Sequence, residues 1–272
     1  MVARMRHLLA LLLILLAPPA LAERIAAVLI GVGAYPNLPG ADLRGPPTDV
    51  RLMAGALIAR GAAPGDILAL TTDPAGLPPG IAARAPTHDA IMDALADLAR
   101  RAGPGVTAVI HFSGHGAQAP DDDGDEMGGM DEILLPMDAA PGGAGVIRDD
   151  AMARAVQAIL DTGARVVGII DACHSATGFR DIRGAGVART LPPDVLALEP
   201  VRGRGAPVPP PRGEYVFLYA AQSDQRAFEF PAEGDPEVWS GAFTTALTAV
   251  LHEAPAATWG QALAEAQARL RT

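Results

Sequence analysis

The sequence predicts an α/β fold with a mostly parallel central sheet and helices on both faces. Short apolar runs rich in Val and Ile alternate along the chain with longer amphipathic stretches. The short runs are continuously apolar, as expected of strands that are buried on both faces of a parallel sheet. The chain without its first 22 residues has about 250 residues, enough for one sizeable core.

The expected elements follow one another in a regular order. Strands are expected at residues 24–33, 66–70, 106–114, 164–172 and 214–221. Helices are expected at residues 47–61, 86–102, 149–161, 241–253 and 258–271. Thr48 and Thr87 stand near the starts of the first two helices, where a hydroxyl that accepts a backbone N–H bond acts as a cap.

The first 22 residues are expected to be a signal peptide. A start with two arginines is followed by an apolar core and by small residues up to Ala22. An uncleaved anchor is the alternative, but the apolar run of about ten residues is well short of the roughly 20 that span a bilayer. We therefore expect an exported protein, periplasmic or secreted, with one domain at residues 23–272 and no stable membrane anchor after signal cleavage.

The charge of the chain argues against nucleic acid or anionic lipid as a partner. All 21 basic residues are arginine, against 31 acidic residues, for a net charge of −10. Loss of the two arginines in the signal peptide leaves a net charge of −12. This balance is compatible with a cationic substrate or a bound cation, and equally with simple solubility of an exported protein.

Two stretches interrupt the alternation. Residues 116–131 are acidic and rich in glycine, which predicts a loop. Residues 178–213 are rich in proline, glycine and arginine and have little periodicity. A loop of that length inside a compact domain is expected to be functional or disordered, and this composition is typical of an exposed, accessible segment.

The only cysteine of the chain stands at the end of an expected strand. Cys173 follows residues 164–172, and His115 stands at the end of the strand expected at 106–114, 58 residues before the cysteine. Ligands collect outside the carboxyl ends of parallel strands, so these two side chains can meet there. A thiolate nucleophile needs an imidazole to take its proton and to protonate the leaving amine. A lone cysteine is commonly buried filler, but the joint placement favours a catalytic pair.

Polar residues precede both members of the pair by two positions. Ser113 stands before His115, and Asp171 stands before Cys173. In extended chain, residues two apart share a face, which places the serine and the aspartate beside the pair.

Two other kinds of site are poorly supported. The stretch GVGAYP lacks the third glycine and the helix start of a dinucleotide-binding fingerprint. His111 and His115 have the spacing of a zinc-binding pair, but they fall in a strand-to-loop stretch and no glutamate follows His111.

The chain resembles the metacaspase-type members of the caspase-like cysteine peptidases over nearly all of residues 23–272. AVLIGVGAYPNLPGADLRGPPTDV is similar to the opening strand and loop of that family, HFSGHGAQAPDDDGDEMGGMDEILLPMD to its histidine motif and DACHSATG to its cysteine motif. YVFLYAAQSDQRAFE and GAFTTALTAVL resemble its smaller C-terminal segment. A histidine about 50 residues before the cysteine is also the caspase arrangement. The resemblance implies a caspase-like three-layer fold.

The resemblance also implies a role for each matching residue. Cys173 would be the nucleophile and His115 the general acid/base, with the oxyanion held by the backbone N–H groups of Gly116 and Cys173. The family's specificity pocket accepts Arg or Lys before the scissile bond, and a carboxylate pair suits a guanidinium. The matching pocket residues are Asp49, Ser113 and Asp171. The implied partners are therefore peptide or protein substrates with Arg or Lys before the cut.

Two departures from the family bear on substrate fit. Pro46 stands where a cysteine is frequent, and Ala176 stands where a glycine is frequent.

The alternative function is a catalytically silent caspase-like domain that binds proteins or peptides.

Activation by calcium is a further implication. Asp131, Asp149 and Asp150 match calcium-binding positions of the family, and Asp181 is nearest to a fourth, one residue out of step. Carboxylate oxygens suit Ca²⁺, although a solvated acidic loop without metal is the alternative. An EF-hand is not indicated, because Glu126 stands where its sixth position requires glycine.

The acidic pocket and the arginine-rich segment together predict self-cleavage. The candidate arginines in residues 178–213 are Arg180, Arg183, Arg189, Arg202, Arg204 and Arg212. We expect the two fragments to stay associated through the shared sheet; the alternative is that the segment is a passive insertion.

Overall fold

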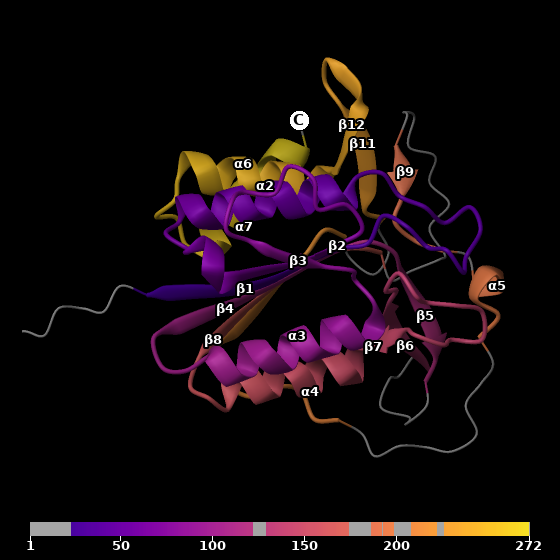
Figure 1. Ribbon diagram of the computed structural model, residues 1–272, viewed down its shortest axis with the longest axis horizontal. Helices are drawn as coiled ribbons and strands as arrows, with labels where there is room; N and C mark the ends of the chain where they lie inside the picture. Colours follow the sequence, from indigo (N-terminus) through magenta and orange to yellow (C-terminus); the bar gives the residue numbers. More distant parts are fainter. Residues whose placement is uncertain are drawn as a thin grey trace, which may run out of the picture.

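A six-stranded parallel sheet forms the centre of the protein (Figure 1). The computed structural model describes residues 23–121, 129–173, 186–191, 193–198, 208–221 and 226–271. The sheet has the strand order β10-β8-β4-β1-β2-β3, and every neighbouring pair is parallel. Its strands are β1 (Arg24–Gly31), β2 (Ile67–Thr71), β3 (Ala82–Arg84), β4 (Val106–Ser113), β8 (Arg165–Asp171) and β10 (Tyr215–Tyr219).

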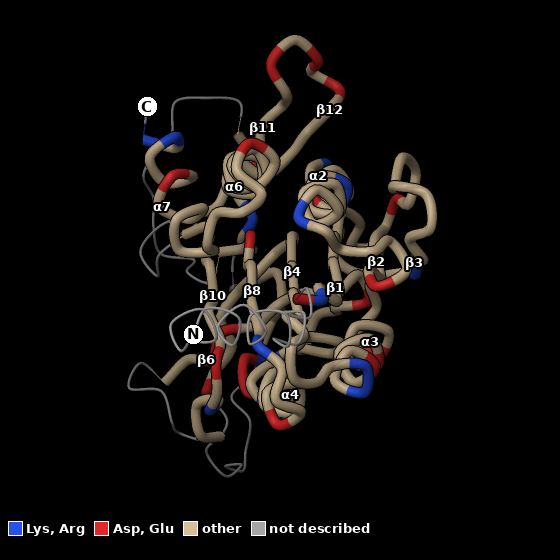
Figure 2. The backbone as a smooth tube through the Cα atoms, turned by 90° about the vertical axis from the view of Figure 1, so that its left-hand side faces the viewer, with Lys and Arg blue, Asp and Glu red and all other residues tan. Residues whose placement is uncertain are grey.

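Helices cover both faces of this sheet, which completes three layers (Figures 1 and 2). One face carries α3 (His88–Arg101) and α4 (Asp149–Leu160). The other carries α2 (Pro46–Ala59), α6 (Ala242–Glu253) and α7 (Trp259–Leu270). The predicted α/β fold with a mostly parallel sheet and helices on both faces is confirmed.

Strand β1 shows why the inner strands of this sheet are mainly apolar. Successive side chains of a strand point to opposite faces. Val28 and Ile30 therefore enter the core on the α3 side, whereas Ala27 and Leu29 enter the core on the α2 side. All four are fully buried, so apolar side chains are favoured on both faces of β1.

Two small sheets lie at the end of the central sheet where β1, β4 and β8 end (Figure 1). One is antiparallel and contains β5 (Gly116–Pro120), β6 (Met130–Leu134) and β7 (Ile147–Arg148). The other is antiparallel and contains β9 (Val187–Ala188), β11 (Phe228–Ala232) and β12 (Asp235–Gly241). A short helix, α5 (Pro193–Leu196), and a 3-10 turn at Pro64–Asp66 complete the described elements.

The predicted strands and helices are all present, with ends that differ by at most two residues. Thr87 caps α3, since its side chain accepts the N–H of Ala90. The prediction that Thr48 caps helix α2 is wrong. Helix α2 begins at Pro46, whose missing N–H costs nothing in the first turn. Thr48 therefore lies inside the helix, where its hydroxyl accepts a bond from the Arg51 side chain.

The two predicted loops are more ordered than their composition indicates. Residues 116–131 contain β5 and the start of β6, while residues 122–128 lie outside the described part. Residues 178–213 contain β9 and α5, and the expected exposure is wrong for Arg189, which is completely buried. The reason is a set of ion pairs at the site described below.

The signal peptide predicted at residues 1–22 lies outside the described residues. In the part of the chain that is described, no helix is both long and apolar enough to cross a membrane.

Candidate active site

His115 and Cys173 follow the carboxyl ends of two adjacent strands. Strands β4 and β8 pair in parallel, with Ser113 opposite Asp171 in the register. His115 and Cys173 each follow these partners by two positions, so they emerge at the same edge of the sheet. Both are buried, with 3% and 1% of their surface exposed. The structure thus brings both residues of the predicted pair to one place.

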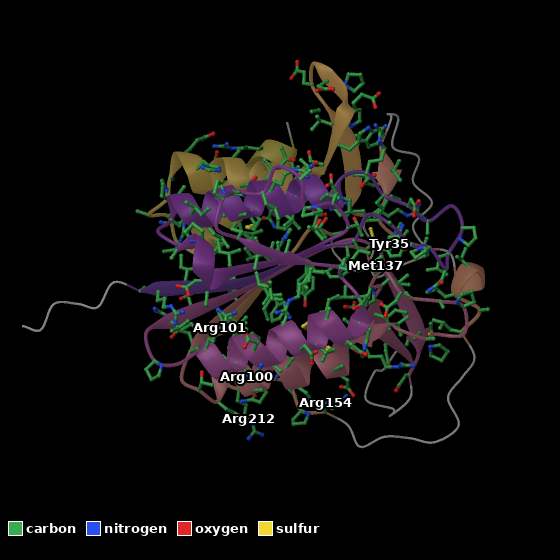
Figure 3. All side chains as sticks on the ribbon, viewed as in Figure 1. Tyr35, Arg100, Arg101, Met137, Arg154 and Arg212 are labelled. Carbon is green, nitrogen blue, oxygen red and sulfur yellow. The ribbon has the colours of Figure 1, made fainter. Side chains whose placement is uncertain are left out.

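Two contacts orient the imidazole of His115. Its Nε2 lies 2.7 Å from the carbonyl oxygen of Ala41, and because a carbonyl only accepts, Nε2 carries the proton. Nδ1 therefore keeps its lone pair. The backbone N–H of His115 donates to the Tyr35 hydroxyl at 2.8 Å, and the two rings lie 5.0 Å apart. Tyr35 is found at the end of the sheet where β1 and β4 terminate (Figure 3).

Burial keeps both reacting groups neutral in the resting site. It lowers the pKa of His115 to about 4, so the imidazole is unprotonated at neutral pH. It also raises the pKa of the Cys173 thiol to about 11, and the negative charge of Asp171 acts in the same direction. The N–H of Ala227 donates to Sγ and opposes this rise. The pair is therefore a neutral thiol and a neutral imidazole whose Nδ1 has no hydrogen-bond partner among the described residues and is free to accept a proton.

Four buried polar side chains form an acidic pocket next to this pair. They come from four separate elements: Asp49 from α2, Ser113 from β4, Asp171 from β8 and Glu229 from β11. The Ser113 hydroxyl donates to Asp49 at 2.7 Å. Burial raises the pKa of Asp49 to about 6. Three of these residues are the predicted pocket residues, and the structure brings them together.

Backbone and hydroxyl donors hold the three carboxylates in place. Asp49 accepts the N–H of Gly241 at 2.8 Å. Asp171 accepts both the N–H and the hydroxyl of Thr244, at the start of α6. Glu229 accepts the N–H groups of Arg44 and Gly45. These donors hold the carboxylates in an arrangement that a guanidinium can bind.

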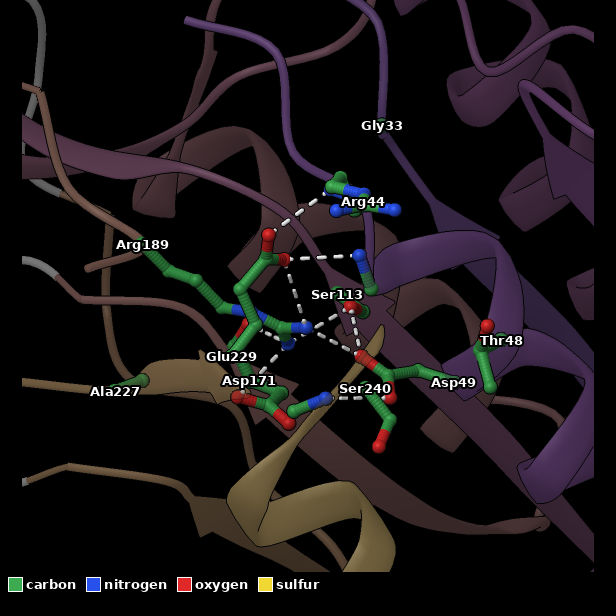
Figure 4. Close-up of polar contacts among 12 residues, drawn as sticks. Gly33, Arg44, Thr48, Asp49, Ser113, Asp171, Arg189, Ala227, Glu229 and Ser240 are labelled. Atoms are coloured by element: carbon green, nitrogen blue, oxygen red, sulfur yellow. Dashed lines mark hydrogen bonds and ion pairs between the residues drawn. The ribbon is translucent and has the colours of Figure 1, made fainter. Parts of the chain in front are cut away.

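The side chain of Arg189 fills this pocket (Figure 4). Its Nη2 lies 2.6 Å from Asp49 and 3.6 Å from Glu229. Its Nη1 lies 3.0 Å from Asp171 and 2.9 Å from the Ser113 hydroxyl. The guanidinium is completely buried, and its neighbouring carboxylates raise the pKa of Arg189. Three acids around one base leave the pocket negative even when it is filled.

The main chain of Arg189 is aligned with the catalytic pair. Its carbonyl oxygen accepts the N–H groups of Gly116 and Cys173, each at 3.2 Å. These are the two donors predicted to hold the oxyanion. Its own N–H donates to the carbonyl oxygen of Ala227 at 3.1 Å, and β9 continues this pairing along β11. Residues 187–189 thus lie as an extended peptide across the site.

Glu229 was not predicted as a pocket residue from the sequence. The available signal was its position between Phe228 and Phe230 in an otherwise apolar strand. The orienting carbonyl of Ala41 has no sequence signal, because every residue carries a carbonyl. Pro46 is the buried first residue of α2, and Ala176 lies outside the described residues.

The acidic residues expected to bind calcium are already partly paired. Asp131 forms an ion pair with Arg148, and Asp150 lies 3.5 Å from Arg154. Burial, with nearby Asp131 and Asp150, raises the pKa of Asp149 to about 6. Within the described ranges no group of three His, Cys, Asp or Glu side chains is arranged to hold a metal ion. The fourth candidate, Asp181, is not among the described residues, so the calcium site stays a prediction.

His111 is a core residue. It is fully buried in β4, and its Nε2 lies 3.3 Å from the Thr244 hydroxyl. Burial lowers the pKa of His111 to about 4.

A cysteine and a histidine at the edge of a three-layer parallel sheet, beside an acidic pocket, define a caspase-like cysteine peptidase fold. Residues 26–181 match the family model described as the metacaspase, peptidase C14 domain. The chain therefore belongs to the metacaspase family.

Individual relatives agree with this family. Metacaspase-2 of Arabidopsis thaliana is 36% identical over 160 residues, which are 59% of this chain and 36% of that protein. Metacaspase-1A of Aspergillus oryzae is 38% identical over 153 residues, which are 56% of this chain and 35% of that protein. The chain thus matches little more than a third of the length of these curated relatives.

A solved structure supports the fold independently. The crystal structure of protein GSU0716 from Geobacter sulfurreducens superposes with a TM-score of 0.62 at 22% identity. The match covers 91% of this chain and 89% of that one.

Proposed function

We propose that the protein is a cysteine endopeptidase that cleaves peptide bonds after arginine, and less efficiently after lysine. One observation carries the proposal. Arg189 has its side chain among three carboxylates while its carbonyl oxygen accepts the N–H groups of Gly116 and Cys173. An arginine in that pocket therefore presents its carbonyl group to the cysteine.

In the first half of the reaction, Nδ1 of His115 takes the proton of the Cys173 thiol. The thiolate attacks the carbonyl carbon of the pocket arginine itself, and the N–H groups of Gly116 and Cys173 stabilise the oxyanion. His115 returns the proton to the leaving amine as the peptide C–N bond breaks. The products are a thioester on Cys173 and the released C-terminal part of the substrate.

In the second half, water hydrolyses the thioester. Nδ1 of His115 takes a proton from the water, which attacks the same carbonyl carbon. The C–S bond breaks and the proton returns to the sulfur. The carbonyl of Ala41 keeps the imidazole in the required tautomer throughout both halves.

A peptide panel tests the proposal. Matched fluorogenic peptides with Arg, Lys, Asp or Gln before the scissile bond should be cleaved in the order Arg, then Lys, with negligible cleavage after Asp and Gln. Cys173→Ala should remove the activity. A chain that binds arginine peptides without hydrolysing them would support the alternative, a silent caspase-like binding domain.

Calcium activation and export are separate proposals that rest on the resemblance. Hydrolysis of the arginine peptide should rise when Ca²⁺ is added to protein freed of metal by a chelator, and calorimetry should detect Ca²⁺ binding. Export is tested by the N-terminal sequence of protein recovered from the periplasm or the medium, which should begin at Glu23.

A further inference from the structure

We infer that Gly45 and Gly241 set the width of the acidic pocket, so that it accepts an unmethylated guanidinium and excludes one that carries methyl groups. The inference rests on the proposed function, to which it adds two specificity-determining residues and a narrower class of substrate. The side chain of Arg189 marks where a guanidinium lies in the pocket (Figure 4). The two glycines border its two terminal nitrogens, one on each side.

The backbone does not require glycine at either position. Gly45 has a φ of −75° and Gly241 a φ of −68°, values that any residue adopts. The space around each Cα gives the reason for glycine instead.

A side chain at Gly45 would collide with the occupant of the pocket. A Cβ there would lie 2.8 Å from Nη2 of Arg189 and 2.9 Å from Oε2 of Glu229. Non-bonded heavy atoms pack best at roughly 3.5–4.0 Å, so one of these groups would have to move. Glu229 is held by the N–H groups of Arg44 and Gly45. The guanidinium is therefore the group that a side chain would displace.

Gly241 closes the opposite side of the pocket. A Cβ there would lie 2.6 Å from Nη1 and 2.9 Å from Cζ of Arg189, and it would also collide with Oδ2 of Asp171. That oxygen accepts both the N–H and the hydroxyl of Thr244, which hold it in place. A side chain at Gly241 would therefore disturb a carboxylate of the pocket as well as its occupant.

Both glycines stand at helix starts, where a side chain is normally useful. Gly45 is the N-cap of α2 and Gly241 the N-cap of α6, and neither helix has a side-chain capping bond there. Helices α3 and α7 begin in the usual way, with caps from Thr87 and Thr258. The glycines thus give up a capping side chain at the two helix starts that face the pocket.

The pocket carboxylates replace the missing caps. Asp171 accepts the N–H of Thr244 in the first turn of α6, as a capping side chain would. Glu229 accepts the N–H of Gly45 at the start of α2. Each helix start is therefore satisfied by an acid from another element, and the volume that a serine or threonine would fill stays open for the guanidinium.

The same contacts imply that the pocket rejects a methylated arginine. Methylation keeps the charge of the guanidinium but replaces an N–H with a larger group. Arg189 has no exposed surface in the pocket, and its terminal nitrogens lie 2.6 Å from Asp49 and 3.0 Å from Asp171. A methyl group on either nitrogen would meet a carboxylate or a glycine. The expected substrates are peptides with an unmethylated arginine before the scissile bond.

Methylated peptides test the width of the pocket from the side of the substrate. Matched fluorogenic peptides carry arginine, ω-N-methylarginine or symmetric dimethylarginine, which has one methyl group on each terminal nitrogen. We expect kcat/KM to fall about tenfold with one methyl group and about a hundredfold with two, mainly through KM. Each peptide is measured with the wild type and with Arg189→Gln, whose pocket holds no guanidinium of its own.

Alanine substitutions test the same width from the side of the protein. Gly45→Ala should lower kcat/KM for the arginine peptide about a hundredfold, and that for the lysine peptide much less, because lysine has no second nitrogen at the Nη2 position. Gly241→Ala should lower both. Gly260→Ala is the matched control, since it lies in the first turn of α7 and its Cβ would meet no atom within 4 Å. Thermal unfolding shows whether each variant is folded.

The outcomes separate this inference from the proposed function. Hydrolysis of the dimethylarginine peptide as fast as the arginine peptide overturns the inference and leaves the proposed function standing, as does wild-type kcat/KM in folded Gly45→Ala and Gly241→Ala. A loss in kcat with KM unchanged also overturns it, because the pocket would then not be the part affected. If an alanine variant fails to fold, the methylated peptides decide alone.

A protein that hydrolyses none of the peptides overturns the proposed function, and binding then decides the inference. Calorimetry compares arginine amide with symmetric dimethylarginine amide on Arg189→Gln. Tighter binding of the unmethylated amide supports the glycine-bordered pocket, whereas equal affinity overturns it.

Discussion

The carboxylate of Glu229 lies 3.6 Å from the guanidinium of Arg189, although the two residues are 40 positions apart in the chain. Glu229 adds a third acid to the pocket, beside Asp49 and Asp171. A planar guanidinium has several N–H groups and can donate hydrogen bonds to carboxylates that lie in different directions. An ammonium group is a single point of charge and cannot reach all three in the same way.

Glu229 should therefore set the preference for arginine over lysine. In Glu229→Gln we expect kcat/KM for the arginine peptide to fall about tenfold, while that for the lysine peptide changes little. Glu237→Gln is the matched control, because that carboxylate is 83% exposed and pairs with Arg44 on the surface. Equal losses on both peptides would contradict a selective role.

Replacement of either member of the catalytic pair should abolish hydrolysis. We expect Cys173→Ala and His115→Ala to lose at least about a hundredfold in kcat/KM, because one lacks the nucleophile and the other lacks the base. Circular dichroism should show the wild-type fold in both. His252→Ala, which changes an exposed histidine, should keep full activity. Wild-type activity in either pair variant would refute the mechanism.

Asp171 should affect both the nucleophile and the pocket. Its charge contributes to the raised pKa of the Cys173 thiol. In Asp171→Asn that pKa falls, so more thiolate is present at a given pH and iodoacetamide should alkylate Cys173 faster between pH 7 and 10. Hydrolysis of the arginine peptide should nevertheless drop severely, because an ion pair to the substrate is lost.

A related measurement tests whether a substrate arginine activates the thiol. A bound guanidinium neutralises Asp171, so an arginine amide should accelerate alkylation of Cys173 in the wild type but not in Asp171→Asn. Unchanged alkylation in the wild type would refute this coupling while leaving the specificity intact.

His111 should make the fold sensitive to acid. The folded protein holds it neutral down to about pH 4, whereas the unfolded chain takes up the proton near pH 6.5. Neutral His111 in the core therefore leaves the free energy of unfolding undiminished above pH 6.5. That free energy falls as the pH drops from 6.5 toward 4, because the unfolded chain then binds a proton that the folded protein does not. The fall amounts to about 3 kcal/mol.

Urea denaturation at several pH values measures this effect. The free energy of unfolding of His111→Asn should fall by about 3 kcal/mol less than that of the wild type between pH 6.5 and 4. The exposed His252→Asn should follow the wild type. Parallel curves for all three proteins would mean that His111 is not held neutral in the fold.

The central sheet and its helices were predictable because they follow local patterns. Residues such as Val28 and Leu29 are apolar on both faces of a strand, and the helices repeat their apolar positions every three to four residues. The short strands of the two small sheets, such as β9, are held by pairing with distant segments instead of by their own periodicity. Composition therefore indicated loops at residues 116–131 and 178–213, which contain β5 and β9.

The sequence by itself determined the catalytic pair, the two oxyanion donors and three of the pocket residues as candidates, because motif and strand position determine which residue types reach the edge of the sheet. Only the tertiary structure decided how they are used. It placed Glu229 in the pocket, turned the carbonyl of Ala41 toward His115, and placed the side chain of Arg189 among the carboxylates. These choices depend on contacts between residues 40 to 185 positions apart, where the burial of a charge is tolerated only if distant partners neutralise it.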